Sequence, residues 1–160
     1  MSETTPRWDL SNIYKGIDDP QLSTDMTDVS KEIQELTAYF EHKLLPLVET
    51  KLPAEELSNR LSKLVEKLNL IFTNAGTIGA FLSGIITTDS YDKKAEQLQS
   101  QYRISMLPLR NLEVRVSAWL GKMSDQLPEA LEVPGTAKEH AFALLEDAQQ
   151  SKFLMSEIEE

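Results

Sequence analysis

The sequence predicts an all-α fold, an elongated bundle of long antiparallel helices with short connections. Apolar residues recur in alternating steps of three and four along most of the chain, which is the period of an amphipathic helix. Prolines and cap-forming residues stand where these runs begin. No alternating apolar and polar pattern of useful length, which a half-buried strand would need, occurs in the 160 residues. We therefore expect an extended N-terminal arm at 1–19 and one helical domain over 20–155.

The first two helices are expected at about 20–45 and 53–88. Asp19 can cap the first helix, and Pro20 suits its first position because the missing N–H has no partner there in any case. Pro46 should end this helix, and Pro53 should open the next. The residues expected to be buried are Leu22, Met26, Val29, Ile33, Leu36, Phe40 and Leu44, followed by Leu57, Leu61, Leu64, Leu68, Ile71, Ala75, Ile78, Leu82 and Ile85.

Three further helices are expected at about 90–121, 124–132 and 137–150. Asp89 or Ser90 can cap the first of them, Pro108 should kink it, and Gly121 should end it. The residues expected to face the core are Tyr91, Ala95, Leu98, Tyr102, Leu109, Leu112, Val116 and Trp119, and then Ala141, Leu144, Leu145 and Ala148.

The segment from Leu68 to Thr88 contains no charged residue, so a membrane-spanning helix is one alternative. Its many Asn, Ser, Thr and Gly residues make transfer into lipid much less favourable than for a leucine-rich segment. We favour a helix buried centrally in the bundle and expect no membrane contact. Gly76, Ala80 and Gly84 recur every four residues and should form a shallow groove for a neighbouring backbone.

Composition narrows the partners and the compartment. The chain has 26 Asp and Glu against 16 Lys and Arg, a net charge of -10, which repels phosphate backbones and argues against nucleic acid. It has no cysteine, so it can form neither a disulfide nor a thiolate nucleophile. The N-terminus, from Met1 to Arg7, has no apolar stretch of the secretory kind. We expect a cytoplasmic protein.

The residues that could carry chemistry are few. His42 and His140 stand apart in the sequence, and neither has a second histidine four residues away to complete a zinc pair on a helix. The carboxylate pairs Glu55-Glu56 and Asp18-Asp19 fit solvated charges at helix starts better than acid–base pairs. We therefore predict no catalytic, cofactor-binding or metal-binding residue in this segment.

Both ends of the chain suggest further contacts. Four residues of the arm are apolar enough that we expect them to pack against a helix pair, either in this domain or in the missing downstream part: Trp8, Leu10, Ile13 and Tyr14. At the other end, Ser156-Glu157-Ile158-Glu159 has the Ser-x-x-Glu form of a capping box. Such a box is useful only before a helix, so we expect 156–160 to start a helix of a missing downstream region.

Three phrases resemble the oligoendopeptidase F group of thimet-oligopeptidase-like zinc metallopeptidases. They are Arg7-Trp8-Asp9-Leu10-Ser11-Asn12-Ile13-Tyr14 with Asp18-Asp19-Pro20 after it, Thr87-Thr88-Asp89 with Ala95 after it, and Phe153-Leu154-Met155-Ser156-Glu157-x-Glu159-Glu160. The first resembles the Trp-Asp-Leu-x-x-Leu-Tyr opening of those enzymes. The second resembles the Thr-x-Asp junction between long N-terminal helices of those enzymes. The third resembles their Leu-Ser-x-x-Glu-Glu phrase.

The resemblance implies that this segment is a non-catalytic N-terminal helical lobe that shapes access to a substrate channel. Zinc, its His-Glu-x-x-His ligands and the oligopeptide substrate would belong with the downstream catalytic domain of the same polypeptide. An apolar patch should then be exposed where that domain belongs, and the isolated segment could self-associate through it. The alternative is a free-standing helical bundle that acts as a scaffold or protein-interaction module.

Overall fold

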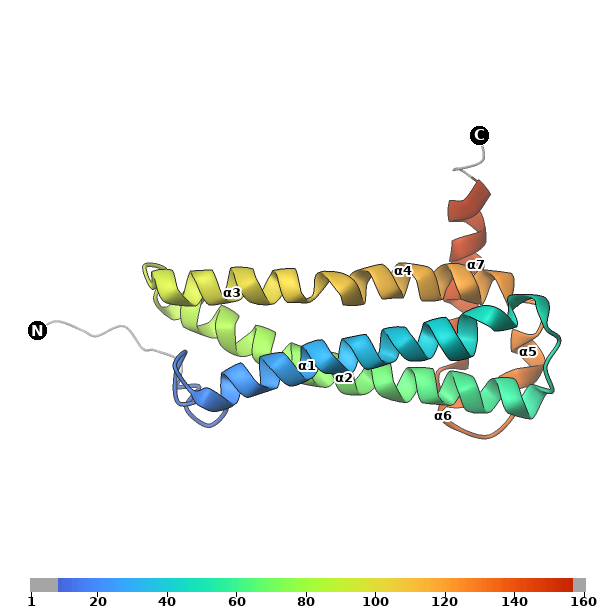
Figure 1. The fold of residues 1–160 in the computed structure, drawn as a ribbon, viewed down its shortest axis with the longest axis horizontal. Coiled ribbons are helices and arrows are strands. Elements are labelled where there is room, and N and C mark those ends of the chain that lie inside the picture. The colour runs from blue at the N-terminus through green and yellow to red at the C-terminus, as the bar shows by residue number, and fades with distance from the viewer. Residues whose placement is uncertain (1–8, 157–160) are drawn as a thin grey trace, which may run out of the picture. The chain divides into compact units, whose positions relative to one another are not determined.

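The computed structural model describes residues 9–156, with side chains through residue 151 (Figure 1). It is 79% helical, and the described residues contain no strand, which confirms the all-α prediction with long helices and short connections. The elements are α1 (Pro20–Tyr39), the π-helical turn η1 (Phe40–Leu44), the 3₁₀ helix η2 (Leu45–Glu49), α2 (Ala54–Thr88), α3 (Lys93–Ser105), α4 (Leu107–Lys122), α5 (Leu127–Ala130), α6 (Thr136–Glu139) and α7 (Ala141–Ser156).

The residues group into two compact units. The first comprises the chain up to Lys31 together with Ile71–Leu107, and the second comprises Glu32–Leu70 together with the chain from Pro108 onward. Because the boundary falls inside α1 and α2, each of these helices contributes to both units. This grouping does not decide whether the two units fold as one domain, so the single domain expected over 20–155 stays a prediction.

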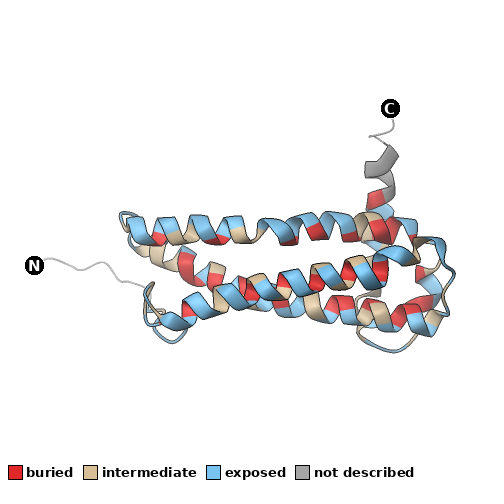
Figure 2. Cartoon of the chain, viewed as in Figure 1, coloured by how far each residue is buried: buried red, intermediate tan, exposed pale blue. Residues whose placement is uncertain are grey.

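In the first unit, the C-terminal half of α2 and the helix α3 lie antiparallel. Tyr102 of α3 is buried and its hydroxyl donates to the Ala75 carbonyl at 2.6 Å, while Gln99 donates to the Ser83 hydroxyl at 3.3 Å. Figure 2 shows the buried residues recurring along one side of each helix. The apolar core of this unit consists of Tyr14, Leu22, Val29, Ile71, Ala75, Ile78, Phe81, Leu82, Ala95 and Tyr102.

The described part of the N-terminal arm is folded into turns and is not extended as expected. The Leu10 carbonyl accepts hydrogen bonds from the amides of Ile13 and Tyr14, and Gly16 accepts from Asp19. The Tyr14 ring meets Phe81 edge-on with centroids 4.9 Å apart, and its hydroxyl donates to Asp25 at 2.7 Å. Local hydrogen bonding and burial of Tyr14 thus favour turns over an extended chain.

The expected packing of the arm is confirmed within this chain at Tyr14, whereas for Ile13 it stays a prediction that concerns the missing downstream part. Tyr14 is buried against α2, and Leu10 lies so close to Gly84 that a side chain there would overlap it. Ile13, by contrast, is exposed. Trp8, for which we also expect burial, lies outside the described residues.

The helix α2 is not buried centrally. Its window of highest hydropathy is 22% buried, and both Leu70 and Phe72 are about half exposed. Gly76 and Ala80 are exposed, with open space beyond Gly76, so they do not form the expected groove for a neighbouring backbone. By length and composition α2 is the one described helix that could cross a membrane, a property that core helices of soluble proteins share. The absence of membrane contact stays a prediction.

In the second unit, Trp119 of α4 is fully buried. Its ring meets Phe40 edge-on with centroids 6.3 Å apart. Its indole N–H is buried without a hydrogen-bond partner among the described residues. The surrounding core consists of Ile33, Leu36, Phe40, Leu44, Leu57, Leu61, Leu64, Val65, Leu109, Leu112, Val116, Leu120, Met123, Leu127, Ala130, Leu131, Ala137 and Ala148.

Most of the expected core positions are confirmed. The exceptions are half-buried residues on otherwise buried faces and Tyr91, which is 91% exposed. Tyr91 lies outside the helix because Asp92, and neither Asp89 nor Ser90, caps α3 by accepting from the amides of Lys94 and Ala95. The half-buried residues are Met26, Leu68, Ile85, Leu98, Ala141, Leu144 and Leu145.

Several helix boundaries differ from the prediction. The chain continues past Pro46 as η2, which can begin there because proline fits the first turn of a helix. Met106 separates α3 from α4, so Pro108 lies in the first turn of a new helix and does not kink a long one. The helix expected at 124–132 shortens to α5, and the last one divides at His140 into α6 and α7.

The end of the chain is described only in part. The helix α7 continues through Ser156, well beyond the expected end at residue 150. The glutamates of the capping box lie outside the described residues. The start of a downstream helix at 156–160 therefore stays a prediction.

Gly121 does not end a helix as expected, because it lies inside α4 and is buried. A Cβ at this position would overlap the Ser151 hydroxyl and meet the Ala148 carbonyl oxygen at 3.5 Å. Glycine therefore permits the close approach of α7 to α4, which a larger residue would obstruct.

We expect Gly121→Ala to lower the free energy of unfolding by about 1–3 kcal/mol, because the added methyl group overpacks this contact. The matched substitution is Gly76→Ala, also in a helix interior but facing open space. It should raise the free energy of unfolding by about 0.5–1 kcal/mol through helix propensity. Urea denaturation followed by circular dichroism measures both, and similar effects of the two substitutions would contradict the packing role of Gly121.

We expect Tyr14→Phe to lower the free energy of unfolding by about 1 kcal/mol, since it removes a hydrogen bond to Asp25 and keeps the ring. Tyr91→Phe is the control, because the Tyr91 side chain is exposed; its effect should stay within about 0.5 kcal/mol. The same denaturation experiment measures both. Equal effects would mean that the Tyr14 hydroxyl does not anchor the arm.

Candidate functional site

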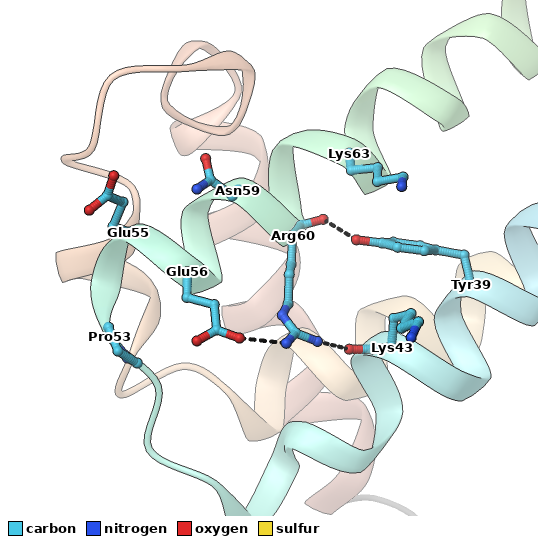
Figure 3. Close-up of a pocket in the computed structure, with 8 residues that line it drawn as sticks. All are labelled: Tyr39, Lys43, Pro53, Glu55, Glu56, Asn59, Arg60 and Lys63. Atoms are coloured by element: carbon cyan, nitrogen blue, oxygen red, sulfur yellow. Dashed lines mark hydrogen bonds and ion pairs between the residues drawn. The ribbon is translucent and has the colours of Figure 1, made fainter.

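The second unit contains an open cleft of about 590 Å³ between the end of α1, η1 and the start of α2 (Figure 3). We call it the Arg60 cleft. Three cations and two carboxylates line it beside one aromatic ring, one amide and one proline. The lining residues are Tyr39, Lys43, Pro53, Glu55, Glu56, Asn59, Arg60 and Lys63.

The local fold positions this cleft. Arg60 and Lys63 are three residues apart in α2 and so share one side of that helix. The segment that precedes α2 is held by Gln126, whose side-chain oxygen accepts from the Leu52 amide at 2.9 Å and whose nitrogen donates to the Thr50 carbonyl at 3.1 Å. These two hydrogen bonds fix how the chain enters α2 from η2.

Arg60 links the two sides of the cleft. Its Nη1 donates to the Lys43 carbonyl at 2.7 Å, and its Nη2 pairs with a Glu56 carboxylate oxygen at 2.5 Å (Figure 3). The Arg60 carbonyl in turn accepts from the Tyr39 hydroxyl at 3.2 Å. The guanidinium is therefore held by a neutral acceptor at one end and a carboxylate at the other.

Tyr39 contributes a neutral ring. Burial raises the pKa of its hydroxyl, and the nearby Arg60 charge offsets only part of that effect. The phenol therefore stays protonated near neutral pH and donates its hydrogen bond. The Lys63 ammonium lies 5.2 Å from the ring centroid, within the range of a cation–π contact.

Two groups of the cleft that could act in acid–base chemistry are already engaged in other contacts. A protonated phenol is no base, and Glu56 is engaged with Arg60. Within the described part of the chain, no group of three His, Cys, Asp or Glu side chains is placed to hold a metal ion. What remains is a set of cations beside a ring, which suits recognition of an anionic group.

Elsewhere the structure separates the residues that the sequence analysis considered. His42 is exposed in η1, whereas His140 is half-buried, with its Nε2 3.4 Å from the Asn69 side-chain nitrogen. Asp18 pairs with Lys94, and Asp19 accepts from the amides of Lys15 and Gln21, which lowers the pKa of its carboxyl.

Sequence reasoning did not find the Arg60 cleft. It treated Glu55 and Glu56 as solvated charges at a helix start, which fits Glu55 but omits the pairing of Glu56 with Arg60. The i,i+4 spacing of Glu56 and Arg60, with Lys63 one turn further, is a signal that was present in the sequence. Tyr39 and Lys43 had no such signal, because the turn between α1 and α2 brings them there.

We expect Gln126→Ala to increase amide exchange at Leu52 about five- to thirtyfold, because the loop before α2 loses both side-chain hydrogen bonds. Gln34→Ala is the control, since Gln34 is exposed in α1. Hydrogen exchange followed by NMR measures the effect. Unchanged protection at Leu52 would show that Gln126 does not hold the loop.

No protein-family model, curated protein or solved structure matches the chain. A functional assignment therefore rests on the residues of the chain and on their arrangement.

Proposed function

We propose that the chain is the non-catalytic N-terminal helical lobe of a cytoplasmic zinc-dependent oligoendopeptidase, and that it shapes access to the substrate channel. One observation carries this proposal. Three phrases, at 7–14, 87–89 and 153–160, resemble phrases of the oligoendopeptidase F group and follow one another along the chain as that resemblance implies.

Two of these phrases have structural roles that depend on their residue types. Leu10 and Tyr14 of the first phrase anchor the arm against α2, and Tyr14 also bonds to Asp25 of α1. In the second phrase, Thr88 ends α2 and the Asp89 side chain accepts from the Tyr91 amide in the turn before α3. A helix junction at this place is what the resemblance implies, and this agreement supports the proposal.

The proposed role of the lobe is steric and does not involve the reaction itself. Zinc and its ligands would lie in the downstream domain, and the lobe would admit extended oligopeptides and exclude folded proteins. Large apolar side chains that solvent reaches are available for contact with that domain, among them Val114 at 71% exposure and Phe142 at 80%. These residues are where self-association of the isolated segment would also begin.

The test starts from the native coding sequence beyond Glu160. We expect it to continue with a helix that carries His-Glu-x-x-His. The full-length protein should then hydrolyse internally quenched oligopeptides and lose that activity when a chelator removes zinc. A variant lacking residues 1–160 should discriminate less between oligopeptides and a folded protein substrate, as measured by the ratio of the two kcat/KM values.

A stop codon after Glu160, or a continuation without the zinc motif, would contradict the proposal. With a stop codon, the chain would be the free-standing bundle of the alternative, a scaffold or interaction module. An unchanged kcat/KM ratio in a stable truncated enzyme would instead contradict the steric role alone.

A further inference from the structure

We propose that the Arg60 cleft binds the carboxylate side chain of an extended peptide, with Arg60 as the receptor. In the free protein, Glu56 would occupy the position of the ligand carboxylate. The inference does not depend on the proposed peptidase role, because it concerns binding to the chain itself.

The Arg60 guanidinium has a second contact that does not involve Glu56. Its Nη1 donates to the Lys43 backbone carbonyl at 2.7 Å. The guanidinium therefore keeps its position when the carboxylate on Nη2 is exchanged. A side chain whose donors are already oriented loses less conformational freedom on binding a ligand.

Glu56 is easy to displace. Its side chain is 45% exposed, and it pairs with Arg60 across one turn of the same helix. Exposed pairs of this kind contribute little free energy, because water solvates the separated charges well. An incoming carboxylate would meet the same Nη2 donor, while Glu56 would turn into solvent.

The surroundings favour an anionic peptide over other ligands. Lys43 and Lys63 add two ammonium groups to Arg60 against the carboxylates of Glu55 and Glu56, in a chain whose net charge is -10. The Tyr39 ring and Pro53 offer apolar surface for the backbone and stems of a peptide. The open cleft of about 590 Å³ has room for a few residues.

The experiment compares two substitutions with the same change of charge. The probe is acetyl-Ala-Glu-Ala-amide, with acetyl-Ala-Gln-Ala-amide as its uncharged counterpart, titrated into the ¹⁵N-labelled 160-residue chain and followed by NMR. Glu56→Gln removes the intramolecular competitor and should tighten binding about two- to fivefold. Glu55→Gln removes another exposed charge of the same cleft, one that forms no ion pair with Arg60, and should change the affinity by less than about twofold.

Shifts at Lys43 and at residues 59–63 with the Glu peptide, absent with the Gln peptide, are expected. Arg60→Gln should abolish them. Equal effects of Glu55→Gln and Glu56→Gln would overturn the proposal, because the attraction would then be a general effect of charge. Equal binding of the two peptides would overturn it as well, and neither result depends on the folding of the Arg60 variant.

Discussion

Burial of one apolar stripe along α1 and α2 is the constraint on which the rest of the structure depends. These two helices contribute long stretches to both compact units, so each unit's core includes residues from both. Burial of apolar area is the main favourable contribution to folding. Intrinsic helix propensity would not keep either helix stable in isolation, so both depend on this burial. The later helices then complete each core, α3 in the first unit and α4 to α7 in the second.

Close contacts at small residues refine this arrangement. Gly84 leaves room for Leu10 of the arm, and Gly121 leaves room for Ser151 of α7. Hydrogen bonds hold the non-helical segments: Tyr14 of the arm bonds to Asp25, and Gln126 holds the loop before α2. The position of the arm and of the loop before α2 thus depends on a few single side chains, whereas the position of each long helix depends on many buried residues.

The two functional proposals have different foundations. The proposed peptidase role rests on short phrases at both ends and in the middle of the chain that resemble one group of enzymes, and it would place the chemistry in a downstream domain. The Arg60 cleft comes from geometry within one unit and concerns binding alone. If both proposals hold, the Arg60 cleft would bind peptide in a lobe that contributes no catalytic group. Contacts far from the reacting atoms would then help to orient the substrate.

The sequence by itself determined the all-α class, the bounds of α2 to within one residue, the cap at Asp19 and most of the buried stripe, because helical period and cap chemistry are local. Only the tertiary structure decided that α3 and α4 are separate, that Gly121 lies inside a helix, and that one side of α2 remains exposed. These features depend on which surfaces meet, and sequence spacing carries no such information. The same holds for the Arg60 cleft, which the sequence analysis did not predict. The spacing of Glu56, Arg60 and Lys63 places them together on α2, whereas Tyr39 and Lys43 reach them only through the turn between α1 and α2.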